Sequence, residues 1–177
     1  MYFSKFEKGF YDIKGDGNQK LVTDLMTRVK VREKILNEAM LYDTYDVPNG
    51  EKPEDTAFKH FGSSEYHWII LLTNNITDRY YGWPLSEQDF ETYITDKYTN
   101  PDAIHHYEIT QSSGPQTGSG PDDYSHKIEV NSTEPGAQSV SNREYEQRIQ
   151  DEKRSIKLLN PSYLQTFIEE FNNLIRN

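Results

Sequence analysis

The sequence predicts an α+β fold, and three observations lead to this class. Residues 41–47 alternate apolar and polar side chains, as a half-buried strand does, and residues 53–75 then carry the start and stop signals of two short helices. Residues 103–109 and 126–130 are strand-like and flank a segment rich in Gly, Ser and Pro, which predicts a β-hairpin insertion. Residues 164–175 repeat apolar side chains at helical spacing, which predicts a C-terminal helix.

The N-terminal part is predicted as an extended arm followed by short helices. Residues 2–13 alternate loosely, which indicates an extended arm or an edge strand, and the Gly-Asp-Gly-Asn sequence at 15–18 is typical of a turn. Apolar residues within 21–36 predict one or two short helices. These helices would carry a basic group, made of Arg28, Lys30, Arg32 and Lys34.

The clearest local signals surround the two central helices. The turn residues 48–50 end the preceding strand, and Pro53 suits the first position of a helix because its missing N–H is not needed there. Gly62 suits the left-handed position that follows a helix. Asn74 and Asn75 then end the second helix.

Beyond residue 84 the prediction alternates helices with loops. Residues 84–98 predict a helix, residues 111–121 a flexible hairpin tip and residues 132–141 a linker. Ser141 and Glu144 have the spacing of a capping box, in which each side chain satisfies a backbone donor of the other residue. We expect the charged helix that starts there to run to about residue 158.

Composition excludes several classes of function. The chain has 177 residues and a net charge of −10, so it lacks the basic footprint of a nucleic-acid binder or a polybasic membrane anchor. It has no cysteine, which excludes disulfides and zinc–thiolate sites. Leu, Ile, Val and Phe make up only 38 of the 177 residues, whereas 23 residues are aromatic. A thin core with many tyrosines favours a protein that completes its burial against partners.

We find no pattern that predicts catalysis, a metal site, a cofactor or a small-molecule substrate. His105 and His106 are adjacent on a predicted strand, so their side chains are expected on opposite faces and could not easily share a metal. Carboxylate pairs are common in so acidic a chain, and a catalytic pair is the remaining enzymatic alternative.

Two segments are candidates for partner binding, and each has a structural alternative. Residues 74–84 concentrate amides and aromatic rings, which suit a protein hot spot, but the same residues could cap helices and fill a small core. The apolar face of the C-terminal helix could likewise be core or interface. The predicted partner-binding residues are Trp68, Asn74, Asn75, Asp78, Tyr80, Tyr81, Trp83, Phe167 and Phe171.

Residues 45–62 resemble the opening of a LysM module, which has an aromatic–x–Val strand, a Gly–acid turn and a helix with a central Ala and a closing aromatic–Gly pair. The resemblance implies a strand–helix–helix–strand unit, and LysM modules commonly bind N-acetylglucosamine polymers. Residues 78–84 stand where the family has its Gly–Val–Ile second strand. The matching structural positions are Tyr45, Val47, Gly50, Pro53, Ala57, Phe61 and Gly62.

Nearly the whole chain resembles the baseplate wedge protein 53 family of contractile-tailed bacteriophages, whose members contain a LysM-like unit used for assembly. The resemblance lies in the order and spacing of short motifs rather than in any one of them. These motifs are residues 1–6, 23–29, 50–53, 66–72, 74–84, 104–108 and 154–159, followed by the final helix.

The resemblance implies a structural virion protein without catalytic activity. Such a subunit would join neighbouring baseplate wedges, contact the large wedge-core subunit and lie near the sheath initiator. It would be located in the tail baseplate of the virion, and in the host cytoplasm during assembly. The alternative function is a peptidoglycan-binding LysM-type module.

Together these patterns divide the chain into four predicted segments. An N-terminal arm with short helices spans residues 1–42, and the LysM-like domain spans residues 43–98. A β-hairpin with a flexible linker spans residues 99–140, and C-terminal helices span residues 141–177.

Overall fold

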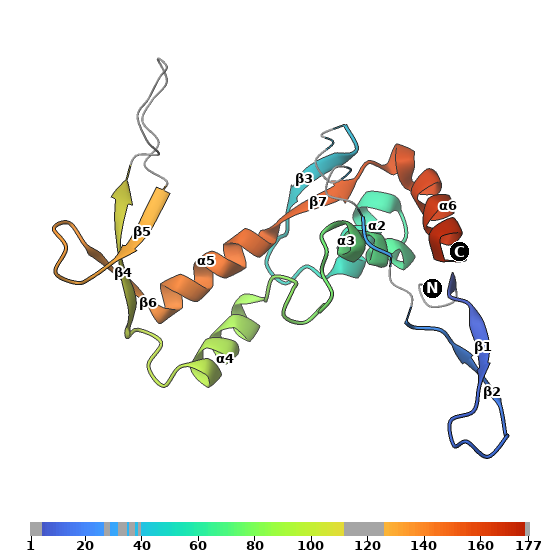
Figure 1. The fold of residues 1–177 in the computed structure, drawn as a ribbon. Coiled ribbons are helices and arrows are strands. Elements are labelled where there is room, and N and C mark those ends of the chain that lie inside the picture. Colours follow the sequence, from blue (N-terminus) through green and yellow to red (C-terminus); the bar gives the residue numbers. More distant parts are fainter. Residues whose placement is uncertain are drawn as a thin grey trace. The chain divides into compact units, whose positions relative to one another are not determined.

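The computed structural model has the α+β fold that the sequence predicts, and its described part combines helices with three small antiparallel sheets (Figure 1). That part comprises residues 5–26, 29–31, 35, 38, 40–111 and 126–175. The chain forms two compact units. Unit 1 contains Met1–Pro84 and Lys153–Asn177, and unit 2 contains Leu85–Glu152. The four segments predicted from the sequence stay a prediction.

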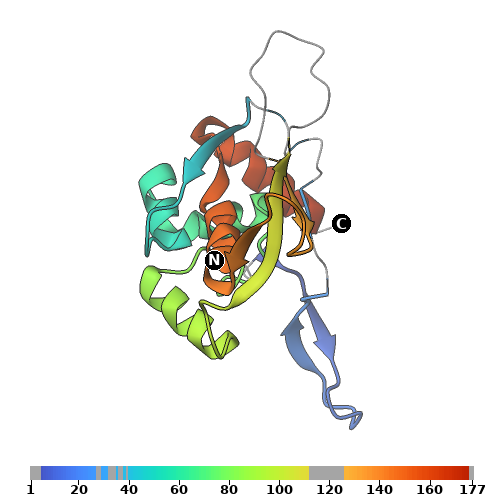
Figure 2. The same ribbon diagram turned by 90° about the vertical axis from the view of Figure 1, so that its left-hand side faces the viewer.

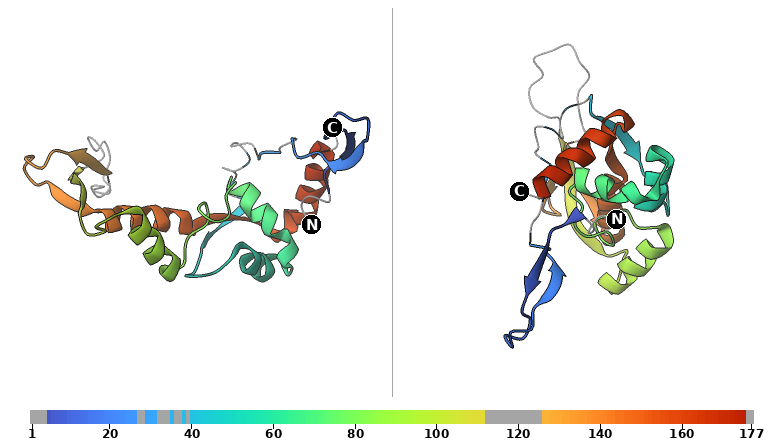
Figure 3. Two further views of the ribbon diagram at one scale, coloured as in Figure 1. Left: turned by 90° about the horizontal axis from the view of Figure 1, so that it is seen from below. Right: turned by 90° about the vertical axis from the view of Figure 1, so that its right-hand side faces the viewer.

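Unit 1 begins with a β-hairpin formed by β1 (Lys8–Tyr11) and β2 (Lys20–Thr23), shown as a two-stranded ribbon in Figure 3. The predicted extended arm is therefore a strand. The helix predicted from residue 21 is wrong at its start, because residues 20–23 pair with the first strand instead of forming a local turn. Residues 27–28, 32–34 and 36 of that predicted helix lie outside the described part.

The centre of unit 1 is a strand–helix–helix–strand arrangement. Strand β3 (Tyr42–Asp46) leads into α2 (Pro53–Phe61), and the 3₁₀ turn η2 (Ser64–Tyr66) leads into α3 (His67–Thr73). The closing strand is β7 (Ser155–Leu159), which pairs antiparallel with β3, and α3 packs against it.

The position of the closing strand corrects one expectation, because residues 155–158 belong to this strand and are not the end of the charged helix. Residues 78–84, which stand where the LysM family has its second strand, form a loop. Along β7, Ile156 and Leu158 are buried whereas Ser155 and Lys157 are exposed. This alternation has the period of two that is typical of a strand. It covers only five residues and directly follows a charged helix, so the sequence pattern does not distinguish a strand from the end of that helix.

Capping residues set the ends of the two central helices as predicted. Pro53 occupies the first turn of α2, and the helix ends at Gly62, whose φ of 78° is left-handed. The backbone N–H of Gly62 donates to the carbonyl of Phe58 at 3.0 Å. Asn74 is the C-terminal cap of α3. These caps are local in sequence, which is why sequence patterns identify them.

Unit 2 contains α4 (Glu87–Lys97) and a three-stranded sheet with the order β5 (His126–Val130), β4 (Ile104–Gln111), β6 (Gln138–Ser141), drawn in Figure 2. Helix α5 (Asn142–Arg154) follows β6. Its last two residues, Lys153 and Arg154, already belong to unit 1. The predicted helix and the two predicted strands are confirmed.

Two expectations about unit 2 are wrong. The predicted linker at 132–141 ends in strand β6, which has a single buried apolar side chain, Val140, and therefore showed no strand pattern. His105 and His106 do not point to opposite faces. A register shift lies between Ile104 and His106, and the two Nδ1 atoms are 2.9 Å apart.

Two apolar clusters form the core of unit 1. The first lies between α3 and the C-terminal helix α6 (Leu164–Ile175), which follows the 3₁₀ turn η3 (Pro161–Tyr163). The second lies between α2, α3 and β7. Phe61 packs against both clusters. Among the described helices, none combines the length and apolarity that a membrane crossing requires.

Candidate protein-interaction site

The amide of Asn74 joins the end of α3 to the closing strand. Its Nδ2 donates to the carbonyl of Lys157 and its Oδ1 accepts from the N–H of Lys157, each at 2.8 Å. Nδ2 also donates to the carbonyl of Ile70 at 2.9 Å. The side chain therefore acts as a short extra strand at the edge of β7, and its polar atoms are used within the fold.

The loop after α3 is held by hydrogen bonds from its own residues. Asn75 has a left-handed φ of 53°, which turns the chain away from the helix. Asp78 Oδ1 accepts from the N–H of Tyr80 at 2.8 Å, and the carbonyl of Asp78 accepts from the N–H of Gly82 at 2.8 Å. A Cβ at Gly82 would lie 2.5 Å from that carbonyl oxygen, so only glycine fits this approach.

This loop presents two tyrosines to solvent, and we refer to residues 78–82 as the tyrosine loop. Tyr80 is 74% exposed and Tyr81 is 63% exposed. The Arg79 guanidinium lies over the ring of Tyr80, 5.8 Å from its centre, and forms an ion pair with Glu54 at 2.9 Å. Lys153 Nζ donates to the carbonyl of Tyr81 at 2.8 Å. Two amphipathic rings are thus exposed on a loop that several hydrogen bonds and an ion pair hold in place.

Three other predicted partner-binding residues lie inside the core. Trp83 is buried in the cluster between α2, α3 and β7, and its Nε1 donates to the carbonyl of Glu51 at 2.8 Å. Trp68 and Phe171 are buried in the other cluster, with ring centres 4.6 Å apart, and the Phe167 ring lies 6.4 Å from Trp68. Their partner-binding role stays a prediction, and the structure places them in the packing of unit 1.

The residues predicted as LysM-like structural positions lie around the turn between β3 and α2. Tyr45 donates from its hydroxyl to Glu51 Oε1 at 2.9 Å, and Gly50 has a left-handed φ of 74°. Val47 and Ala57 are buried in the second cluster, with Tyr45 and Phe61 packed against it. Pro53 and Gly62 mark the ends of α2.

Glu51 is a buried carboxylate at the centre of this turn. It accepts hydrogen bonds from Thr56 Oγ1 at 2.7 Å, from Tyr45 and from Lys59, which also pairs with it electrostatically. Burial disfavours the charged form, but the hydrogen bonds from Lys59, Thr56 and Tyr45 outweigh it and hold the pKa of Glu51 below its ordinary value. The group is a structural link between β3 and α2.

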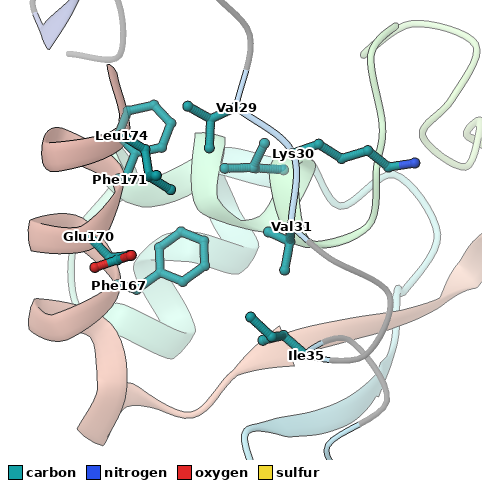
Figure 4. Close-up of a pocket in the computed structure, with 9 residues that line it drawn as sticks. Val29, Lys30, Val31, Ile35, Phe167, Glu170, Phe171 and Leu174 are labelled. Carbon is teal, nitrogen blue, oxygen red and sulfur yellow. The ribbon is translucent and has the colours of Figure 1, made fainter. Parts of the chain in front are cut away.

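An apolar groove runs beside α6. It has a volume of about 540 Å³ and is lined on the helix side by Phe167, Phe171 and Leu174, which lie along one face of α6 (Figure 4). Val29, Val31 and Ile35 lie opposite them, and Leu72 completes the apolar lining. Glu170 and Lys30 are its charged members, and Lys30 points away from the groove in Figure 4. Sequence reasoning identified the two phenylalanines but not the segment across from them.

Two buried carboxylates of unit 2, Glu108 and Glu146, are paired with basic side chains. Glu108 of β4 receives a two-pronged contact from Arg148 at 2.7 and 2.9 Å, and Lys127 lies 2.6 Å from it. Glu146 of α5 accepts from Tyr98 at 2.8 Å and pairs with Lys97 at 2.6 Å. These buried carboxylates join the sheet and α4 to α5. In the described residues, no group of three or more His, Asp and Glu side chains could hold a metal ion.

Comparison with known proteins identifies one family. The model of the family "Base plate wedge protein 53" matches residues 1–113, which is more than half of the chain. The "Baseplate wedge protein gp53" of Enterobacteria phage T4 is 32% identical over 57 residues. That alignment covers 32% of this chain and 29% of the T4 protein, so the chain matches less than a third of the length of this relative.

Proposed function

The chain belongs to the base plate wedge protein 53 family, and from this premise we propose that it joins neighbouring wedges of a contractile phage tail through protein–protein contacts. Membership of this family indicates a phage baseplate wedge protein, which interacts with other baseplate components in the tail of the virion. Within that setting we assign it a structural and not a catalytic role. We propose the large wedge-core subunit as its main partner and the sheath initiator as a neighbour.

The tyrosine loop is the observation that carries this proposal. Tyrosine is enriched in interface hot spots, because a rigid ring buries a large area and its hydroxyl can still bond to a partner. Tyr80 and Tyr81 are exposed, yet their loop is anchored by Asp78 and by Arg79. An anchored loop loses little conformational entropy on binding, which favours a stable contact.

The test is incorporation of a loop variant into tails. Tyr80→Ala together with Tyr81→Ala should leave the chain folded, since both side chains are exposed, and should lower its amount in gradient-purified tails by about tenfold or more. Tyr163→Ala is the matched control, because this exposed tyrosine lies in η3, outside the loop. Quantitative mass spectrometry of the purified tails gives the readout. Equal incorporation of the loop variant and the control would contradict this interface.

A second candidate is binding of peptidoglycan by a LysM-type module. The arrangement of β3, α2, α3 and β7 favours it, since it is a strand–helix–helix–strand unit. One observation disfavours it. The amide of Asn74, which is one of the predicted binding residues, is already hydrogen-bonded to the backbone of Lys157. Co-sedimentation of the purified chain with insoluble peptidoglycan tests this candidate, and a chain that stays in the supernatant would remove it.

A further inference from the structure

Strand β3 pairs with β7 along one edge, and hydrogen bonds at its two ends show which of its residues face the other edge (Figure 1). The carbonyl of Leu41 accepts from the N–H of Asn160 at 2.8 Å, and the N–H of Val47 donates to the carbonyl of Arg154 at 2.9 Å. Because bonded pairs alternate along an antiparallel ladder, every second residue between Leu41 and Val47 turns its backbone groups away from β7. These residues are Tyr42, Thr44 and Asp46.

The same alternation on β7 directs backbone groups to the opposite side of the sheet, where the fold itself bonds them. Both backbone groups of Lys157 point away from β3, and the amide of Asn74 bonds to them. The carbonyl of Leu159 accepts from His60 Nε2 at 2.8 Å. The outer edge of β7 is therefore closed at these two positions.

The outer edge of β3 has no such partner in the described part of the chain. No hydrogen bond among the described residues involves the backbone N–H or carbonyl of Thr44 or Asp46, and both residues are exposed. An exposed strand edge with free donors and acceptors is a template on which another strand can pair. An added strand would bond to the main chain of these two residues, as extended peptides do on other open sheet edges.

Charge indicates which kind of strand fits. β3 carries two exposed aspartates, Asp43 and Asp46, no basic residue, and no ion pair to either carboxylate from the described residues. They are three residues apart and thus lie on opposite faces, so an added strand would meet one carboxylate on each face. Arg154 and Lys157 lie on the β7 side, two strand spacings or about 10 Å from an added strand. A strand that carries lysine or arginine on both faces would complement this edge.

A second copy of this chain is a poorer occupant. Pairing of two β3 strands would place four aspartates on neighbouring strands of one sheet, whatever the register. Like charges in such positions destabilise a sheet. The same carboxylates attract a basic strand, so charge distinguishes the two occupants.

We infer that the free edge of β3 accepts an extended, basic segment of another baseplate protein as a third strand, next to β3 and on the side away from β7. This inference rests on the proposed function, because it names a second contact of the same subunit, separate from the tyrosine loop. Main-chain hydrogen bonds contribute affinity, and the two aspartates select a basic segment.

The experiment uses the purified full chain and baseplate wedges isolated from infected cells that lack only this protein. Thr44→Pro removes the outward N–H and keeps the bonds between β3 and β7, because proline is tolerated at edge positions whose N–H faces solvent. It should weaken co-sedimentation with the wedges by about tenfold or more. Thr44→Val is the matched control, since it keeps the N–H and the preference for strands, and it should bind as the wild type does.

A second variant tests the charge without changing the backbone. Asp43→Asn with Asp46→Asn should weaken binding at low salt and change it little at high salt, where the carboxylates are screened. Hydrogen exchange followed by mass spectrometry reads the edge directly. The outward amides of residues 42–46 should exchange about tenfold more slowly, or slower still, in the complex of the wild type with the wedges than in the free chain.

The outcomes separate this inference from the proposed function. If the wild type binds the wedges and Thr44→Pro binds equally well, the strand-addition inference is wrong and the wedge-joining proposal stands. If the wild type does not bind, both are contradicted. If the asparagine variant binds as the wild type does at low salt, the segment is not basic and the inference is wrong.

Two controls complete the design. A dimer of the purified chain in sedimentation velocity that Thr44→Pro abolishes would identify a second copy as the occupant and contradict the inference. Circular dichroism shows whether each variant is folded. If Thr44→Pro is not, the asparagine variant and the hydrogen exchange of the wild type decide the question.

Discussion

The side-chain amide of Asn74 is hydrogen-bonded to both backbone groups of Lys157, which lies 83 residues further along the chain. This pair of bonds, each 2.8 Å long, joins the cap of α3 to the edge of β7. The same residue also bonds to the last turn of its own helix through Ile70. One polar side chain thus closes the strand–helix–helix–strand arrangement of unit 1.

Asn74→Ala should therefore destabilise unit 1. The change removes the side-chain amide that is the hydrogen-bond partner of the N–H and the carbonyl of Lys157, and it also removes the cap of α3. We expect a loss of about 1–3 kcal/mol in the free energy of unfolding, measured by urea titration with tryptophan fluorescence. Asn173→Ala is the control. Asn173 is exposed on α6, and replacing it by a better helix former should change stability by about 0.5 kcal/mol or less.

Trp83→Ala should destabilise the chain more strongly, because it removes a large buried ring from the cluster with Ile70 and Ile156. The expected loss is about 3–5 kcal/mol. Trp83→Phe keeps most of the apolar area but removes the donor that bonds to the carbonyl of Glu51, so its loss should be smaller, about 1–3 kcal/mol. Urea titration followed by circular dichroism measures both variants. An unchanged stability for Trp83→Ala would contradict the core position of this ring.

Gly82→Ala should disturb the tyrosine loop. The added Cβ would lie 2.5 Å from the carbonyl oxygen of Asp78 and 2.9 Å from a methyl carbon of Ile76, so the backbone of the loop must shift. We expect a loss of about 1–3 kcal/mol and, if the loop is the interface, reduced incorporation into tails. Gly9→Ala is the matched control, since a Cβ there meets no atom within 4 Å. Thermal melting and tail incorporation of the two variants give the comparison.

Acid should weaken unit 2 through Glu108. The two-pronged contact from Arg148, together with Lys127, outweighs burial and lowers the pKa of Glu108 from 4.5 to about 2. Because the folded-state pKa is the lower one, the ionised group stabilises the fold at pH values above about 4.5. This stabilisation is lost as the pH falls from about 4.5 towards 2.

The measurement is the urea midpoint of the wild type and of Glu108→Gln between pH 2 and pH 7, followed by far-ultraviolet circular dichroism. Glu108→Gln should be less stable at pH 7 and should show a smaller loss on acidification, because the titrating group is gone. Glu129→Gln, at the exposed position opposite Glu108 on β5, should keep the acid-dependent loss of the wild type. Parallel pH profiles for the wild type and Glu108→Gln would rule out this role of Glu108.

Local features of the fold were predictable because their signals lie within one turn or one strand. Pro53, Gly62 and Asn74 act through the conformation of their own backbone and the nearest carbonyls, so their residue types are sufficient to identify them. The same holds for the turn residues at the tip of the first hairpin. The family could be identified for a related reason, since it rests on the order and spacing of such short segments.

The candidate site was only partly predictable. Residues 74–84 were identified as a unit, but the sequence left open whether their rings face a partner or the core. The structure divides them. Trp83 is buried and its Nε1 donates to the carbonyl of Glu51, whereas Tyr80 and Tyr81 are exposed. Aromatic residues suit both environments equally well, so composition alone does not distinguish them.

The sequence by itself determined the α+β class, the ends of the central helices and the family of this protein, because each depends on neighbouring residues or on their order. Only the tertiary structure decided that β7 closes the sheet with β3 and that β2 is a strand rather than a helix. In both cases a short apolar segment is compatible with either conformation, and the partner strand with which it exchanges backbone hydrogen bonds selects one. For β7 that partner lies more than a hundred residues away, beyond the reach of any local pattern.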